Sequence, residues 1–218
     1  MGQVQTGSAR VLRWSRLHAF AVTGLVIVLI AQSCGGQAPS NPAAPPLETV
    51  ACGGERWAVK TLSDAAATNV NLNAAQATTI RALNELPTHC SGLPATRAFA
   101  EEFVLYEVVG RITLVRLEDD HDYHVAVVDP SDGAYTMVTE VPDVACEGAA
   151  SSPFMRDLGS VRQSFEQLFA GRSPSSLVGT TVRLRGVGFY DFDHGQTGRS
   201  RNCLELHPIV SVVRVPGS

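Results

Sequence analysis

The chain has 218 residues, of which 44% are hydrophobic and 17% are charged, and it contains 19 glycines and 12 prolines. This composition excludes a disordered chain, a collagen-like repeat and a coiled coil. The formal net charge of −4, from 17 basic and 21 acidic residues, argues against a protein that binds nucleic acid through an overall positive charge. The length is sufficient for one or two domains with a hydrophobic core.

Residues 1–33 have the features of an export signal. They carry three arginines and no acidic residue, and end in an apolar run that stops at Ala31; the run is short for a membrane span and typical of a signal-peptide core. The small residues Ala31 and Ser33 suit ordinary cleavage. Cys34, followed by two glycines, resembles a bacterial lipoprotein site, although Gln32 is unusual there. We expect a lipoprotein, with plain secretion and an uncleaved anchor as alternatives.

The rest of the chain divides into three parts. Residues 34–49 are rich in proline and alanine and predict an extended tether. We expect residues 50–100 to form an N-terminal extension that packs on a barrel domain over 101–218. Cleavage after residue 33 removes three arginines and no acid, so the mature net charge is 14 − 21 = −7. A lipid on Cys34 would anchor this domain to a membrane of the cell envelope.

Two short elements are expected in the extension. Residues 57–60, Trp-Ala-Val-Lys, are consistent with a short strand. Residues 75–86 predict a short helix with Ile80 and Leu83 on one side, which ends before Pro87.

From Phe103 the pattern changes to strands. The first, 103–118, is long and contains Gly110, which is typical of a bulge or sharp bend. Further strands are expected over 123–128, 135–141, 180–189 and 204–215, with a helix over 157–170. The order β-β-β-α-β-β is that of an OB-fold, a five-stranded Greek-key barrel. We predict a mainly β protein with an OB-fold-like five-stranded barrel and one helix between strands 3 and 4; another small barrel or sandwich is the alternative.

Four cysteines besides Cys34 are spread over the mature chain without a C-x-x-C pair, so the sequence indicates neither a zinc ribbon nor a thioredoxin motif. An even count in an exported chain predicts two disulfides. The candidates are Cys52, Cys90, Cys146 and Cys203. Their spacing leaves all three pairings open.

Several stretches resemble a single family of uncharacterised exported bacterial proteins. The matching stretches are ERWAVKT (55–61), LEDDHDYH (117–124), GVGFYDF (186–192), HGQTG (194–198) and ELHP (205–208). The resemblance covers most of residues 52–212 and implies no established activity. The chain departs from the family after HGQTG, where it has Arg-Ser-Arg-Asn-Cys in place of an apolar residue and Pro-Asn-x-Ile.

The resemblance also bears on the disulfides. The family has equivalents of Cys52 and Cys146 but not of Cys90 and Cys203. Because added cysteines tend to pair with each other, the resemblance implies the pairs Cys52–Cys146 and Cys90–Cys203.

Two loops hold most of the unusual polar residues. In an OB-fold the loops between strands 1 and 2 and between strands 4 and 5 flank the ligand face; here they are residues 119–122 and 191–202. Four of the six histidines fall in or beside them. The candidate binding residues are His121, Tyr123, His124, Asp191, Asp193, His194, Gln196, Glu205 and His207.

One interpretation of these loops is a metal site, because imidazole and carboxylate groups suit Zn²⁺. The candidate ligands are His124, His194 and His207, with Asp122 or Asp193. The alternative is a solvated acidic turn with hydrogen-bonded strand histidines.

A second interpretation is binding of a polymer on the sheet. Aromatic residues offer stacking surfaces, and four arginines form a local basic edge; these are Tyr123, Tyr135, Phe189, Tyr190 and Phe192, and Arg183, Arg185, Arg199 and Arg201. The acidic loop and the net charge argue against nucleic acid, so an envelope saccharide or peptide is the expected ligand. The alternative is that the aromatics are core residues.

No nucleophile elbow, P-loop or Rossmann glycine pattern is present. We therefore expect an exported, lipid-anchored envelope protein that is a ligand- or partner-binding OB-like module without a cofactor. The alternative functions are a metal-dependent hydrolase that uses the His and Asp residues of 119–124 and 191–207, and a purely structural envelope protein.

Overall fold

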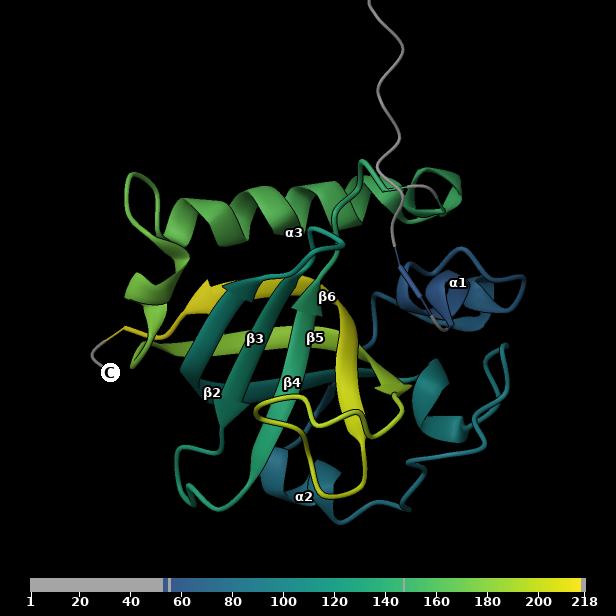
Figure 1. Ribbon diagram of the computed structural model, residues 1–218, viewed down its shortest axis with the longest axis horizontal. Coiled ribbons are helices and arrows are strands. Elements are labelled where there is room, and N and C mark those ends of the chain that lie inside the picture. Colours follow the sequence, from purple (N-terminus) through teal and green to yellow (C-terminus); the bar gives the residue numbers. More distant parts are fainter. Residues whose placement is uncertain (1–52, 55, 147, 217–218) are drawn as a thin grey trace, which may run out of the picture. The chain divides into compact units, whose positions relative to one another are not determined.

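Five long strands form the centre of the computed structural model, which describes residues 53–216 except 55 and 147. They are β2 (Leu105–Leu117), β3 (Tyr123–Val128), β4 (Thr136–Val141), β5 (Thr181–Tyr190) and β6 (Leu204–Arg214) (Figure 1). Their bounds lie within two residues of the expected ones. The described residues belong to the second of two compact units, 45–218. The expected signal peptide (1–33) and tether (34–49) lie outside the described residues, as do Cys34 and Cys52.

The strands close into a barrel in the order β2-β3-β4-β6-β5, with β5 pairing back onto β2. β4 and β6 run parallel, and the other neighbours in the barrel are antiparallel. This is the strand order of an OB-fold. The predicted OB-fold-like five-stranded barrel, with its helix between the third and fourth barrel strands, is confirmed.

β2 pairs with both β3 and β5 and so closes the barrel. It can do so because it is long and bends. Its first half, up to Arg111, pairs with β5, and its second half, from Arg111 onward, pairs with β3, with a register shift between Ile112 and Leu114. The expected bend is therefore present, directly after Gly110. A Cβ atom on Gly110 would lie 2.9 Å from the Cβ of Val127, so the absence of a side chain permits this close approach.

Helix α3 (Met155–Leu168) buries Leu158, Val161 and Phe165, of which Val161 and Phe165 belong to the barrel core. It crosses the top of the barrel in Figure 1, while α2 (Ile80–Asn84) lies below the barrel in that view. α2 is capped by the side chain of Thr79, which accepts a hydrogen bond from the amide of Ala82. It is shorter than the helix expected over 75–86, because residues 76–77 instead form β1 (Gln76–Ala77), which pairs with β2.

The strand suggested for residues 57–60 is wrong, since Trp57–Lys60 is one helical turn, α1. The preceding Arg56 adopts a left-handed backbone with φ of 60°, and the turn buries Val59. Four short 3₁₀ segments complete the described elements: η1 (Ala67–Asn69), η2 (Ala100–Phe103), η3 (Ala149–Ser151) and η4 (Pro174–Leu177). None of the helices in the described part of the chain combines the length and the apolar character that a bilayer crossing requires.

A buried ion pair fastens the extension to the barrel. The guanidinium of Arg56 donates two hydrogen bonds to the carboxylate of Glu102, at 2.6 and 3.0 Å, and a third to the carbonyl oxygen of Tyr190 at the end of β5. Both side chains of the pair are at most 2% exposed. Burial alone would raise the pKa of Glu102, but the hydrogen bonds from Arg56 and from the amide of Ala98 outweigh it and hold the pKa below its ordinary value.

We expect Arg56→Ala to lower the free energy of unfolding at pH 7 by about 3–5 kcal/mol, because it leaves the carboxylate of Glu102 buried without its partner. The lowered pKa means that the contribution of Glu102 is complete above 4.5 and disappears as the pH falls through the folded-state value. The difference between the variant and the original protein therefore shrinks in acid. Urea unfolding at a series of pH values measures it.

The matched control is Arg183→Ala, which breaks an ion pair to Glu107 whose arginine is 53% exposed. We expect a loss of about 1 kcal/mol or less. Equal losses in the two variants would contradict the structural role assigned to Arg56.

Candidate functional site

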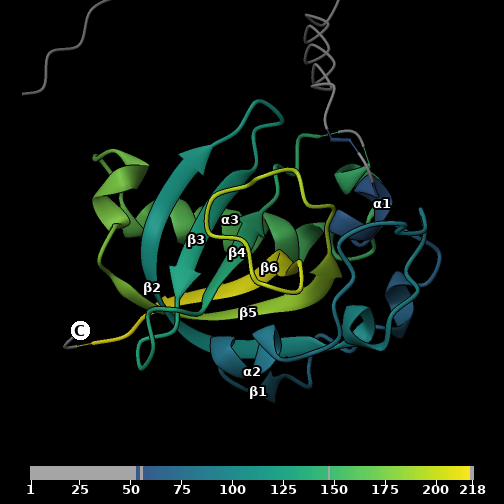
Figure 2. The same cartoon turned by 60° about the horizontal axis from the view of Figure 1, so that its bottom comes forward.

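Polar side chains gather on the outer wall of the barrel, beneath a loop. Along β3, β4 and β6, residues that face the core alternate with residues that face outward. The outward residues include His124, Glu140, Glu205 and His207, and all four are buried. They are covered because the β5–β6 loop, residues 191–203, folds over the outer face of β3 and β4 (Figure 2).

The loop contacts the barrel wall at close range. Nε2 of His124 lies 2.9 Å from the carbonyl oxygen of Thr197, and Oγ1 of Thr136 donates to the carbonyl oxygen of Arg199 at 2.9 Å. Gly198 has a φ of +87°, and a Cβ there would overlap Ala126. Only glycine permits this combination of backbone angle and contact.

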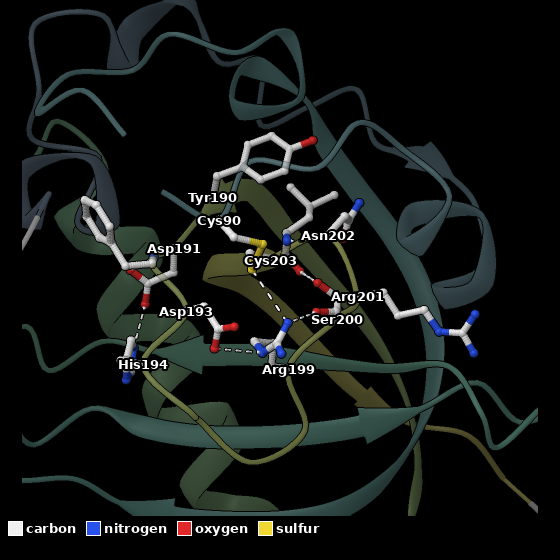
Figure 3. Close-up of a disulfide and its surroundings, with 12 residues drawn as sticks. Cys90, Tyr190, Asp191, Asp193, His194, Arg199, Ser200, Arg201, Asn202 and Cys203 are labelled. Carbon is white, nitrogen blue, oxygen red and sulfur yellow. Dashed lines mark hydrogen bonds and ion pairs between the residues drawn. A yellow bond between two sulfur atoms is a disulfide. The ribbon is translucent and has the colours of Figure 1, made fainter. Parts of the chain in front are cut away.

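A disulfide fixes the far end of the loop to the extension. Cys90 and Cys203 are bonded (Figure 3), which confirms the pair that the resemblance implies. The amide of Asp193 donates to the carbonyl oxygen of Cys90 at 3.2 Å. Cys146 is also disulfide-bonded, and its expected partner Cys52 lies outside the described residues.

Beneath the loop, imidazoles and carboxylates alternate in a continuous row. Nδ1 of His124 lies 3.1 Å from Oε1 of Glu140, and Oε2 of the same glutamate lies 3.0 Å from Nδ1 of His207. Nε2 of His207 lies 3.7 Å from Oδ2 of Asp122. No side chain of the row is more than 10% exposed. The row therefore places two carboxylates and two imidazoles in a largely buried environment.

The carboxyl groups of this region differ in their pKa values. Burial alone would raise the pKa of Glu140, but the imidazoles of His207 and His124 outweigh it and hold that pKa well below its ordinary range. Burial raises the pKa of Asp122 to about 8. Burial and the nearby carboxylates of Glu140 and Asp191 raise the pKa of Glu205 well above its ordinary value. Carboxyl groups thus outnumber the cations available to neutralise them.

Lys60 of α1 supplies positive charge from the opposite side. Its Nζ lies 3.7 Å from Oδ2 of Asp191. Burial alone would lower the pKa of the ammonium group, but the carboxylates of Glu140, Asp191 and Glu205 outweigh it and raise that pKa above its ordinary value. Lys60 therefore stays charged and compensates part of the excess negative charge.

A pocket of about 310 Å³ opens between the β2–β3 turn and the β5–β6 loop. Five of its lining residues are carboxylic acids and two are permanent cations, so its surface favours positive charge. The acids are Glu118, Asp120, Glu140, Asp191 and Glu205; the cations are Lys60 and Arg116. His124, His194, Gly195, Gln196 and Thr197 complete the lining.

Two groups in this region have the composition of a metal site. One consists of Glu118, His124 and Glu140, and the other of Asp122, Glu140 and His207, with one ligand atom from each residue lying within 4.8 Å of the others. Glu140 belongs to both groups. Imidazole with carboxylate oxygens is a ligand set that zinc and related transition metals accept.

The structure brings some of the predicted site residues together and not others. His124, Asp191, His194, Gln196 and Glu205 line the pocket. His207 lies behind it in the row with Glu140. The three histidines predicted as metal ligands do not meet, because His194 is 60% exposed, contacts Asp191 at 3.2 Å (Figure 3) and belongs to neither metal-type group.

Three predicted binding residues lie elsewhere. His121 is exposed in the β2–β3 turn, 3.6 Å from a carboxylate oxygen of Asp143. Asp193 pairs with Arg199 at 3.2 Å (Figure 3). Tyr123 points into the core, where its ring packs against Phe165. None of the three lines the pocket.

The aromatic stacking surface is also not formed as expected. Phe189 and Tyr190 are completely buried, as is nearly all of Tyr123. Arg183 and Arg185 both pair with the carboxylate of Glu107 instead of forming a free basic edge. Tyr123, Phe189 and Tyr190 therefore lie in the protein interior, as the alternative interpretation of the sequence expected for all five aromatic residues.

The residue at the centre of the site, Glu140, was not predicted from the sequence. It is the charged residue of β4 and the register partner of His124 across the β3–β4 pair. The available signal was an acidic residue inside a buried strand, which requires a partner. Lys60 was missed because residues 57–60 were interpreted as a strand, and Glu118 because it was assigned to the end of β2.

No protein-family model matches the chain, and no curated protein matches it significantly. The family resemblance noted above therefore stays a prediction.

The pKa values of Glu140 and Glu205 are shifted in opposite directions. We therefore expect unequal losses of stability when each is replaced by glutamine. In a metal chelator at pH 7, we expect Glu140→Gln to lower the free energy of unfolding by about 3–5 kcal/mol, because two buried imidazoles lose their anion. Glu205→Gln should change it by about 1 kcal/mol or less, because the raised pKa keeps that carboxyl protonated. Urea unfolding compares the two variants.

The pH dependence provides the control. Since the pKa of Glu205 is raised in the folded state, the original protein loses stability relative to Glu205→Gln as the pH rises from the ordinary value of 4.5 through the folded-state pKa. A difference that is constant with pH would contradict a protonated Glu205.

Proposed function

We propose that this chain is an exported, lipid-anchored envelope protein whose barrel binds a positively charged ligand in the pocket beneath the β5–β6 loop. The observation that carries this proposal is the acidic lining of the pocket: besides Glu205, whose pKa is raised, it has four carboxylic acids against two permanent cations. Its wall includes the buried Glu140, which keeps its negative charge. A cation that enters the pocket gains Coulomb energy that is larger here than in bulk water.

The position of the pocket supports a binding role. OB-folds bind their ligands near the loops that join strands 1 and 2 and strands 4 and 5, and the corresponding segments here supply Asp120, Asp191 and the stretch 194–197. The phosphates of a nucleic acid would be repelled by this lining. Of the two expected envelope ligands, a peptide with basic side chains gains from the charge, whereas a neutral saccharide does not.

The location in the envelope is supported by the sequence alone. Residues 1–33 have the composition of a signal peptide, and Cys34 lies where a lipoprotein would be lipidated. A tether over 34–49 would hold the barrel away from the membrane to which the lipid anchors it.

A metal-dependent hydrolase is the second candidate function. The observation that favours it is that Glu118, His124 and Glu140 form a metal-type group and also line the pocket, so that an ion there would face a bound molecule. Turnover that requires an added divalent metal would distinguish this hydrolase from a binding module, which converts no substrate.

The binding proposal predicts that trilysine raises the thermal midpoint of the purified protein at low ionic strength and that triglutamate does not. The stabilisation follows from binding to the folded state alone. High salt should reduce it, because screening weakens attraction at this open pocket. Differential scanning fluorimetry measures the shift.

Variants locate the effect. Glu118→Gln with Asp120→Asn removes two charges from the pocket and should abolish most of the shift. The matched control, Glu85→Gln with Asp132→Asn, removes two charges from residues that do not line it and should keep the shift. Equal shifts in both double variants would contradict the proposed site.

A further inference from the structure

Three ligand-type side chains converge behind the pocket from three segments of the barrel. Asp122 directly precedes β3, Glu140 lies in β4 and His207 lies in β6. A ring nitrogen of His207 and one oxygen of each carboxylate lie within 4.8 Å of one another. Ligand atoms around a tetrahedral zinc ion lie about 3.3 Å apart, so side-chain movements of about 1 Å would complete the site.

The atoms that face one another are those that hydrogen bonds leave free. Oδ2 of Asp122 and both ring nitrogens of His207 are buried and lack a hydrogen-bond partner among the described residues. Nδ1 of His207 lies 3.0 Å from Oε2 of Glu140, but it is out of line for a hydrogen bond. Buried polar atoms are rarely left in this state in folded proteins.

The remaining atoms of the two carboxylates are held in place. Oδ1 of Asp122 accepts a hydrogen bond from the amide of Asp143 at 2.7 Å. Oε1 of Glu140 lies 3.1 Å from Nδ1 of His124, whose Nε2 lies 2.9 Å from the carbonyl oxygen of Thr197. Such outer contacts orient the ligands in protein metal sites and fix which oxygen faces the ion. In each carboxylate, one oxygen is thus held by a polar contact and the other is available to an ion.

Because the free atoms of this group are buried, a bound cation would stabilise them. Asp122 and His207 are each at most 1% exposed, so water cannot solvate their free atoms. A divalent ion would bind one ring nitrogen of His207 together with a free oxygen of Asp122 and of Glu140, and would balance the excess of carboxylates around Glu140 and Glu205. The group of Glu118, His124 and Glu140 has no such unpartnered ring nitrogen, because both ring nitrogens of His124 already have partners.

We propose that Asp122, Glu140 and His207 bind a divalent transition-metal ion, with His124 as a positioning residue for Glu140. One imidazole nitrogen and two carboxylate oxygens favour Zn²⁺ or a neighbouring transition metal over Mg²⁺ and Ca²⁺, which prefer oxygen ligands alone. Three protein ligands leave a further position for water or for a ligand. This inference goes beyond the proposed function, because Asp122 and His207 lie behind the pocket and are not part of its lining.

The test is a titration of the full purified protein, stripped with a chelator, by Zn²⁺ in competition with a chromophoric chelator. We expect one equivalent to bind, with Mg²⁺ unable to displace it. Asp122→Asn, which preserves the size of the side chain, should weaken binding by about 10-fold or more. The matched histidine variants are His207→Gln, which should abolish binding, and His89→Gln, which should not change it because His89 lies in neither metal-type group and outside the pocket lining.

Circular dichroism and urea unfolding in chelator separate a lost ligand from a lost fold, and Asp122→Asn keeps the test valid if His207→Gln does not fold. X-ray absorption at the zinc edge should detect one imidazole among oxygen neighbours. Zinc binding that is unchanged in folded Asp122→Asn would overturn the inference, because the ion would then bind elsewhere.

A titration of the same protein with trilysine separates the test of the metal site from the test of the proposed binding in the pocket. If trilysine binds in the pocket but Zn²⁺ does not, the metal site is overturned and cation binding stands. If neither binds, both are overturned, and the row is an ion-paired cluster that neutralises itself. Zinc binding that Asp122→Asn weakens supports the metal site, whether or not trilysine binds.

Discussion

Burial of negative charge beneath the β5–β6 loop is the constraint that organises this side of the molecule. An ionised carboxylate taken out of water needs an opposite charge or a set of hydrogen bonds. Glu140 receives two imidazoles, at 3.0 and 3.1 Å. Lys60 is brought against Asp191 by α1. Glu205 accepts one hydrogen bond, from Gln196, and forms no ion pair with a described residue; burial raises its pKa, as it raises that of Asp122.

The surrounding structure keeps this region closed. The barrel supplies the row of side chains, because His124 and Glu140 are register partners on adjacent strands. The loop is held at one end by the disulfide of Cys90 and Cys203 and against the wall by the contact between Thr197 and His124. The extension contributes through the buried Arg56–Glu102 pair, which also bonds to Tyr190 beside the start of the loop.

Much of the fold could be predicted from the sequence because it depends on local patterns. Alternating apolar residues located the strands, Gly110 located the bend, and the strand order then implied the barrel and its two ligand loops. The error at residues 57–60 has a tertiary cause, since burial of Arg56 and Val59 imposes a helical turn on a β-like segment.

The site was less predictable, because it depends on which loop covers which strand. The sequence identified His124 and His207 but gave no reason to prefer them over His194, which the fold leaves exposed. It did not identify Glu140, whose role arises from being placed between two histidines that are 83 residues apart (207 − 124). The excess of carboxyl groups arises because strands pair and a loop folds over them. The sequence of a single strand does not show it.

The most direct test of this account is a crystal structure of the protein soaked with Zn²⁺, with diffraction measured above and below the zinc absorption edge. The account predicts an anomalous peak enclosed by Asp122, Glu140 and His207, with the β5–β6 loop still closed over the barrel. An occupied zinc position elsewhere, with these three side chains left unliganded, would contradict it.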